Sequence, residues 1–279
     1  MARRDNLRDE DITALSPTEK MAIVSVADEA GRPHQALLSS LMASGPRELV
    51  IGEFTRGRSK DNMRSRPSVG FIAMTLDRRI WRGAARWTRS ARQGPEYEAF
   101  NAKPMFRYNS YFGVNTVHYL DLEWIEGPDP LPMAAIAASK IATIARSGSR
   151  ALRSDSGALS PYARSLVDGL SSLSFLSWIE AGGEPRIVPV AQARSAGSGR
   201  LVFTPGPYRR DLGRAPDGAK ASVFSFNMSM ESLLSLGTYR APRRAARLGA
   251  LEIEEVYNPM PPIPGRVWPA PALAPVREF

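Results

Sequence analysis

Residues 49–72, LVIGEFTRGRSKDNMRSRPSVGFI, decide the fold of this chain. An apolar, β-branched run ends at Thr55, a glycine-containing basic turn follows, and Ser59 then stands where a helix N-cap would stand. Pro67 ends the helix before a second apolar run begins at Val69. The stretch therefore predicts a strand, a basic turn, a short helix and another strand.

The start of this short helix is suited to a phosphate group. A helix start offers free backbone N–H groups and the positive end of the helix dipole, and Arg56, Arg58 and Lys60 add positive charge beside it. The alternative is a solvated basic turn that joins two strands and binds nothing.

Length and composition limit the classes of protein that come into question. With 279 residues, 43% of them hydrophobic, the chain is long enough for two domains of ordinary size. It has no cysteine, which excludes disulfides, thiolate metal sites and cysteine nucleophiles. Only two histidines, His34 and His118, are present, so a site of several histidines around a metal is not expected.

The charge pattern and the lack of long apolar runs bear on partners and location. The N-terminus is charged, and no run of about 18 apolar residues occurs, so we expect a cytoplasmic protein with no membrane partner. The net charge of +9 would suit nucleic acid, but the basic residues are scattered over the chain. Their densest group, at 240–247, falls in a predicted connection between strands, so nucleic acid is the less favoured partner.

The first part of the chain reads as a small β domain. Residues 1–15 are interpreted as a polar leader, and Ser16-Pro17-Thr18-Glu19 as a capping box that starts a short helix. Residues 28–33 have the composition of a hairpin turn. An aromatic-rich segment at 90–118 predicts a helix with a covering loop. The expected strands are 22–27, 34–41, 48–54, 68–75, 80–88 and 117–126.

The same pattern returns after an alanine-rich, helical stretch. Residues 176–185, LSWIEAGGEP, repeat 24–33, VSVADEAGRP, and further matches follow as far as residue 254. The sequence thus predicts an internal duplication, with domains at 1–130 and 172–279 and a helical connector at 131–171. The second copy has Pro205-Gly206-Pro207-Tyr208 where the first has its basic turn, and it lacks the serine. Residues 257–269 are too proline-rich for regular structure and predict an arm that packs over a domain, covers a ligand or reaches a partner subunit.

A family resemblance follows from Arg58-Ser59-Lys60 together with Gly31-Arg32-Pro33 before it and Arg66-Pro67 after it. This arrangement resembles the pyridoxamine 5'-phosphate oxidase-like split barrels, a family that binds FMN. The similarity is strongest over 16–127, and 172–257 looks like a divergent second member. The resemblance implies a mainly β protein of the α+β class, with two tandem split β-barrel domains joined by the connector.

The resemblance also implies a cofactor site. Three residues of the turn would bind the FMN phosphate, three others would hydrogen-bond the flavin side, and two in the helix are secondary candidates. These residues are, in the same order, Arg58, Ser59 and Lys60; Ser39, Ser40 and Thr55; and Asn62 and Met63. Because the family builds its site between two barrels, the chain would form either an intrachain pseudo-dimer or a homodimer.

Two functions stay open on the sequence alone. The first is an FMN-dependent oxidoreductase acting on a small substrate. The second is a non-enzymatic barrel protein that has lost flavin or binds haem or a deazaflavin. No Ser/His/Asp or paired-carboxylate constellation stands out, and the substrate-binding arginine and histidine of the true oxidase are missing near the C-terminus, so pyridoxamine phosphate is not the expected substrate. His118 is interpreted as a packed or surface residue.

Overall fold

The computed structural model describes residues 3–54, 57–103, 113–242, 247–260 and 264–272. The chain divides into two compact units. The first comprises Met1–Met133 with Ser177–Val188, and the second comprises Ala134–Leu176 with Pro189–Phe279. The domain boundaries expected from the sequence stay a prediction.

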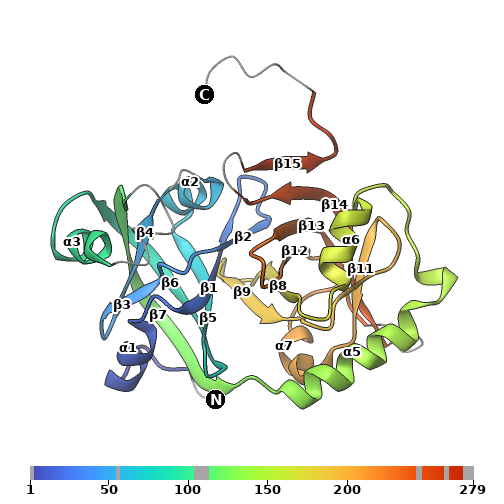
Figure 1. Ribbon diagram of the computed structural model, residues 1–279, viewed down its shortest axis with the longest axis horizontal. Helices are drawn as coiled ribbons and strands as arrows, with labels where there is room; N and C mark the ends of the chain where they lie inside the picture. Colours follow the sequence, from blue (N-terminus) through green and yellow to red (C-terminus); the bar gives the residue numbers. More distant parts are fainter. Residues whose placement is uncertain (1–2, 55–56, 104–112, 243–246, 261–263, 273–279) are drawn as a thin grey trace. The chain divides into compact units, whose positions relative to one another are not determined.

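The first sheet has seven antiparallel strands in the order β2-β1-β5-β6-β7-β4-β3. Figure 1 shows its strands with helices α1, α2 and α3. The strands are β1 (Lys20–Ala27), β2 (Pro33–Leu37), β3 (Met42–Gly45), β4 (Glu48–Glu53), β5 (Ser68–Thr75), β6 (Arg79–Ala91) and β7 (Thr116–Pro130). The helices of this part of the chain are α1 (Asp9–Leu15), α2 (Arg58–Ser65) and α3 (Pro95–Ala102).

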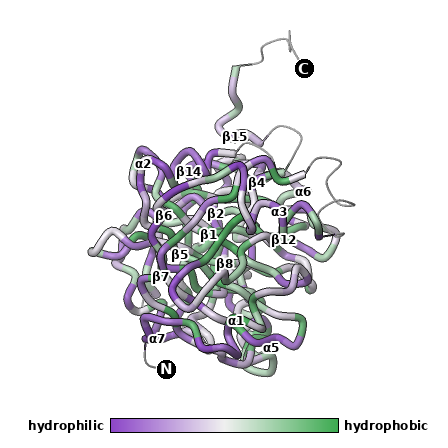
Figure 2. The backbone as a smooth tube through the Cα atoms, turned by 90° about the vertical axis from the view of Figure 1, so that its left-hand side faces the viewer, coloured by the Kyte–Doolittle hydropathy of each residue, from purple (hydrophilic) through white to green (hydrophobic). Residues whose placement is uncertain are grey.

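Alternating side chains of these strands make the core of the first unit. Val24, Ile51 and Phe71 point into one buried cluster, which Met63 of α2 completes. Figure 2 shows the hydrophobic colouring of β1 and β5. Gly83 of β6 allows a close approach, because a Cβ there would collide with the ring of Phe71 and the carbonyl oxygen of Trp124.

The second sheet repeats the strand order of the first. Its path is β9-β8-β12-β13-β14-β11-β10, and β15 is added beside β14. Its strands are β8 (Leu173–Ile179), β9 (Pro185–Pro189), β10 (Arg194–Ser195), β11 (Arg200–Phe203), β12 (Lys220–Phe226), β13 (Ser232–Arg240), β14 (Gly249–Asn258) and β15 (Gly265–Trp268). Two similar antiparallel sheets confirm the expected fold class, an α+β protein with tandem split β-barrels.

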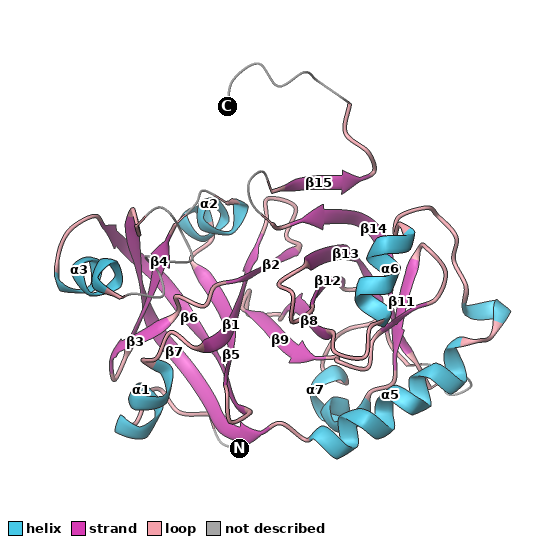
Figure 3. Ribbon diagram, viewed as in Figure 1, coloured by secondary structure: helices cyan, strands magenta, loops and turns pink. Residues whose placement is uncertain are grey.

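Helices occupy most of the segment between the two sheets, as Figure 3 shows. They are α5 (Met133–Ser147), the short 3₁₀ turn η1 (Arg150–Leu152) and α6 (Pro161–Asp168). Ser160 caps α6, since its Oγ accepts a hydrogen bond from the Ala163 N–H at 3.2 Å. In the second unit, η2 (Gly206–Tyr208) and α7 (Arg209–Leu212) follow β11.

The interpretation of the N-terminal residues is wrong. Residues 1–15 are not a leader, because they contain α1, and no helix starts at Ser16. α1 forms earlier because Asp11 accepts hydrogen bonds from the Arg8 backbone N–H and from Trp81 Nε1, both at 2.9 Å. Ser16 lies at the other end of this helix and donates its hydroxyl to the Ile12 carbonyl at 2.6 Å.

Two further expectations on strands need correction. The second strand ends at Leu37 rather than at Leu41, and the short strand β3 follows it. The tail is not without regular structure, since β15 pairs with β14 through Val256 and Trp268. The hairpin at 28–33 and the strand at 68–75 are as predicted, with Gly31 at φ +71° in the turn.

Candidate anion site at the start of α2

α2 begins at Arg58, and its N-cap is Gly57, not Ser59 as expected. Gly57 has an extended backbone and no side chain, so no side chain caps the helix. Ser59 lies inside the first turn and is buried, with its Oγ 3.3 Å from Nδ1 of His34 on β2. The positive dipole end of the helix, which favours an anion, lies at this turn, and the Lys60 N–H already donates to the Gly57 carbonyl at 3.1 Å.

One side of α2 packs on the protein and the other meets solvent. Met63 is buried in the hydrophobic core of the first unit, and Lys60 is also buried. Arg58 and Arg64 are exposed. Figure 1 shows α2 near one end of β2 and β4. The helix is therefore anchored from below, while the Arg58 side chain stays accessible at its first turn.

His34 is held neutral beneath this turn. Burial lowers the pKa of its imidazole to about 4, and the positive charge of Arg58 acts in the same direction. A neutral imidazole can accept from or donate to the Ser59 hydroxyl without adding charge. The positive charge at the start of α2 therefore comes from Arg58 and Lys60.

A buried hydrogen-bonded chain lies beside Lys60. Trp87 Nε1 donates to Nδ1 of His118 at 3.2 Å, so the imidazole proton sits on Nε2, which lies 2.9 Å from Oε2 of Glu53. Burial raises the pKa of Glu53, but the hydrogen bond with His118 and the charge of Lys60 outweigh it and lower that pKa.

The same surroundings also shift the pKa of Lys60. Burial lowers the pKa of Lys60, while Glu53 and Asp61 act to raise it. His118 is fully buried, in keeping with its interpretation as a packed residue. No signal in the sequence marks Glu53 as a partner of this site beyond its position just before the basic turn.

The other predicted residues are spread over different environments. Ser40 is buried and donates its hydroxyl to the Gly52 carbonyl at 2.8 Å. The carbonyl of Ser39 lies 3.4 Å from Nζ of Lys20. Asn62 has a buried Nδ2 with no hydrogen-bond partner among the described residues. Thr55 lies outside the described residues, as does its neighbour Arg56.

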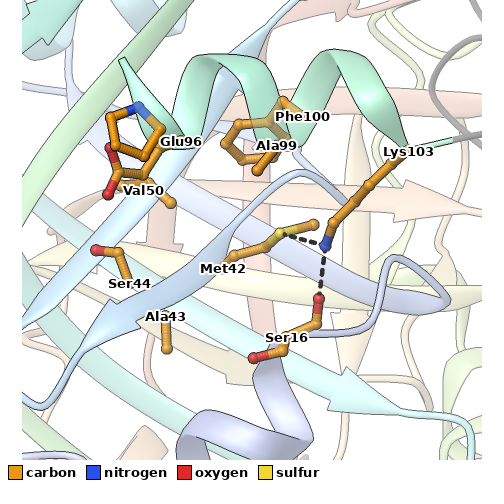
Figure 4. Close-up of a pocket in the computed structure, with 10 residues that line it drawn as sticks. Ser16, Met42, Ala43, Ser44, Val50, Glu96, Ala99, Phe100 and Lys103 are labelled. Atoms are coloured by element: carbon orange, nitrogen blue, oxygen red, sulfur yellow. Dashed lines mark hydrogen bonds between the residues drawn. The ribbon is translucent and has the colours of Figure 1, made fainter.

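A cavity of about 260 Å³ lies elsewhere in the first unit, between α3 and the strands β3 and β4 (Figure 4). Lys103 stands on one side of it, where Nζ donates to the Ser16 carbonyl at 3.1 Å and lies 3.2 Å from Sδ of Met42. The sequence pointed to this place only through the aromatic-rich segment that supplies α3. The residues that line the cavity are Ser16, Met42, Ala43, Ser44, Val50, Pro95, Glu96, Ala99, Phe100 and Lys103.

A second lysine lies close to Lys103. Lys20 is buried, and its Nζ donates to the Pro17 carbonyl at 2.6 Å. Burial, followed by the repulsion of Lys103, lowers the pKa of Lys20 to about 7. Burial also lowers the pKa of Lys103. Both ammonium groups are therefore easier to deprotonate than that of a lysine in water.

Two kinds of feature are not found in the part of the chain that the structure describes. There is no group of three or more His, Asp or Glu side chains placed to hold a metal ion among these residues. No described helix is both long enough and apolar enough to cross a membrane.

No family model matches this chain. No curated protein matches it either. Among solved structures, it is similar to a protein described as a pyridoxamine 5'-phosphate oxidase from Lactobacillus delbrueckii, with 18% identity and a TM-score of 0.36 over 44% of this chain and 96% of that one.

Two other solved structures are similar at the same level. An FMN-binding protein from Syntrophomonas wolfei shares 14% identity over 44% of this chain and 86% of its own, with a TM-score of 0.36. A haem-binding protein from Mycobacterium smegmatis shares 14% identity over 64% of this chain and 86% of its own, with a TM-score of 0.29. Such similarity concerns the fold alone. The fold itself is described by the two antiparallel sheets, which share one strand order.

Proposed function

We propose that the first unit binds a phosphorylated flavin, FMN, with the phosphate at the start of α2. The observation that carries this proposal is a helix start without a side-chain cap, beside the exposed guanidinium of Arg58. The buried Nδ2 of Asn62, which has no partner among the described residues, is a second donor in the same helix. A dianion at this place would receive backbone, amide and guanidinium donors together.

The residues of the proposed site would have different tasks. Arg58 would pair with the phosphate, and the Ser59 hydroxyl, held near His34, would donate to it. Lys60 would contribute a positive potential from below, moderated by Glu53. Met63 would hold the helix in place through its packing in the core. Ser39, Ser40 and Thr55 stay proposed contacts of the flavin side.

A bound flavin would supply the oxidation or reduction of a small substrate. The cavity beside α3 is our proposed place for that substrate, an apolar molecule with an anionic group, because apolar side chains line it and Lys103 stands at one side. The chain's own residues would then bind and orient both molecules. The repeated strand order further supports an origin by internal duplication.

A second candidate function is a non-enzymatic barrel that binds haem or a deazaflavin, or nothing. It is favoured because side chains at the proposed flavin site already make contacts within the protein. Ser40 donates to Gly52, and Glu53 lies beside Lys60 as a competing anion. These contacts would limit how many donors a flavin could receive.

Titration of the purified protein with FMN and with riboflavin tests the proposal. Both ligands carry the isoalloxazine ring and the ribityl chain, so only the phosphate differs. We expect the fluorescence of FMN to be quenched in a saturable manner as it binds. We also expect FMN to bind at least tenfold more tightly than riboflavin, since one charge-assisted contact is worth about 1.5 to 3 kcal/mol. Equal affinities for the two ligands would contradict a phosphate site at the start of α2. A Soret band after addition of haemin, with no response to either flavin, would support the second candidate.

A further inference from the structure

Helix α5 makes polar contacts with the rest of the second unit. Thr143 is fully buried, and its Oγ1 lies 3.0 Å from Oγ1 of Thr204. Lys140 donates from Nζ to the carbonyl of Gly169 at 2.7 Å. Ser139 accepts a hydrogen bond at its carbonyl from the Thr204 hydroxyl at 3.1 Å. The buried residues of α5 are thus one apolar side chain, Ile136, and one hydroxyl, Thr143, with the Lys140 ammonium group bonded beside them.

The opposite side of α5 is apolar and exposed. Its residues recur at the three- and four-residue spacing of one helix face, and we name this face the outer strip. The outer strip consists of Ala134, Ala137, Ala138, Ile141, Ile144 and Ala145. Ile141 is 70% exposed and Ile144 is 42% exposed. A surface helix ordinarily turns its apolar side toward the core and its polar side toward solvent. An exposed apolar strip of this kind therefore marks an interaction surface.

A further apolar side chain stands near the inner side of the same helix. The carbonyl of Leu170 lies 3.3 Å from Nζ of Lys140, and the Leu170 residue is 87% exposed. Figure 3 shows α5 as a long helix that is followed by the helical turn η1 and a loop before α6.

The charge around the outer strip is mainly positive, although Asp155 lies 3.8 Å from the guanidinium of Arg153. Residues 131–153 contain Lys140, Arg146, Arg150 and Arg153 but no aspartate or glutamate. The three arginines are exposed. The whole second unit carries 17 lysines and arginines against 9 aspartates and glutamates, a net charge of +8, whereas the first unit carries +1. The partner of this surface should therefore be anionic.

We propose that the outer strip, with Arg146, Arg150 and Arg153, is a docking surface for an anionic lipid bilayer. An apolar helix face can lie at the boundary between headgroups and acyl chains, while arginines beside it meet the lipid phosphates. The binding is peripheral, since no described helix could span a membrane. The proposal departs from the expectation of no membrane partner, which rests on the charged N-terminus and the lack of long apolar runs.

A second copy of the chain fits this surface less well. A helix of 15 residues is about 22 Å long, and one face of it covers well under the roughly 800 Å² per partner of a stable protein interface. Two copies would also bring the same arginines together. A bilayer requires neither shape complementarity nor a minimum area, and it supplies the opposite charge.

Co-sedimentation of the full chain with vesicles tests this proposal. Vesicles of phosphatidylcholine with phosphatidylserine are compared with vesicles of phosphatidylcholine alone, at low and high salt. We expect at least a tenfold preference for the anionic vesicles, and we expect salt to weaken it, because each arginine near an anionic surface is worth about fivefold in affinity.

Variants assign the binding to the outer strip. Ile141→Glu with Ile144→Glu should lower the vesicle affinity at least tenfold, and Arg146→Glu with Arg150→Glu should do the same. The control is Leu76→Glu, because Leu76 is 81% exposed in a turn of the first unit and should be neutral. Thermal unfolding of each variant checks that it is folded.

Two results would overturn the proposal. One is absence of binding to anionic vesicles, or binding that the Ile141→Glu and Ile144→Glu changes leave intact. The other is a concentration-dependent dimer, seen by sedimentation equilibrium, that these two changes abolish while vesicles have no effect. That outcome would assign the strip to a second copy of the chain.

Discussion

The two turns that follow β4 and β11 occupy the same place in the strand order, yet only the first keeps an open helix start. α2 has eight residues after Gly57, whereas α7 has four residues after the 3₁₀ turn η2. Each is anchored by one buried apolar side chain, Met63 in α2 and Leu212 in α7. The shared anchor shows that the turn is part of the fold, and the length of the helix decides what else it can do.

The second turn is closed by its own unit. Thr204, at the end of β11, accepts at its carbonyl from Gln192 Nε2 at 2.6 Å and donates its backbone N–H to Thr143 Oγ1 at 3.1 Å. A Cβ at Gly206 would meet Ser139 Oγ of α5, so α5 packs against the turn. In the first turn such contacts would be open to a ligand. In the second turn they are made with the helical connector. The difference teaches that an anion site in this fold needs the turn to stay uncovered.

Removal of the anchors should have the largest effects. Met63→Ala and Leu212→Ala should each lower the free energy of unfolding by about 2 to 5 kcal/mol, because each leaves a cavity in a packed core. Urea unfolding measures this loss. Only Met63→Ala should also abolish FMN binding under native conditions. If both variants bound FMN as the unchanged chain does, α2 would not be the site.

The next largest effect is a pH dependence of folding stability, which we expect for the first sheet and not for the second. The pKa of His34 is lowered to about 4 in the folded chain, so the unfolded chain takes up a proton first as the pH falls below about 6.5. Stability is therefore present above pH 6.5 and is lost progressively down to about pH 4, by roughly 3 kcal/mol in all. The second sheet has Arg186 after Pro185 where the first has His34 after Pro33, so it should lack this dependence.

His34→Gln tests this dependence. Urea unfolding at pH 7 and pH 4.5 should show a much smaller loss of stability in the variant than in the unchanged chain. An equal loss in both would place the acid sensitivity in other groups. Glu53 would not be one of these groups, because the stability that its lowered pKa provides is lost only below about pH 4.5.

The smallest effect concerns two Ser-Pro pairs that look alike in the sequence. Ser160 caps α6, whereas Ser16 bonds to a carbonyl at the end of α1. Ser160→Ala should cost about 1 kcal/mol, and Ser16→Ala should cost less, because only the first leaves a helix N–H without its acceptor. Thermal or urea unfolding of both variants measures the difference. Equal losses would mean that the cap contributes nothing beyond a surface hydroxyl.

These pairs also show how far sequence reasoning reaches. The strands and the repeat were predictable, because alternating apolar runs and glycine turns are local signals. The same local signal at Ser16-Pro17 was misleading. There α1 is stabilised by Asp11, whose partners Arg4 and Trp81 lie far apart in the sequence. Such tertiary contacts override a capping pattern.

The candidate site was predictable in position but not in detail. The basic turn and its short helix are present, but the N-cap is Gly57 and not Ser59. Glycine has no side chain that could mark it as a cap in the sequence. Glu53 and His118 are brought together from β4 and β7, which pair only in the folded sheet. A pattern along the chain cannot show a hydrogen bond between strands that are 65 residues apart.

The most direct test of the account is the FMN dissociation constant of two matched variants, Arg58→Ala in α2 and Arg209→Ala in α7. Both arginines are exposed at the first turn of their helices, so neither change should unfold the protein. If the phosphate binds at the start of α2, Arg58→Ala weakens FMN binding by about 1.5 to 3 kcal/mol, at least tenfold, and Arg209→Ala leaves it unchanged. Equal affinities in the two variants, or a larger loss with Arg209→Ala, would contradict a phosphate site at the start of α2.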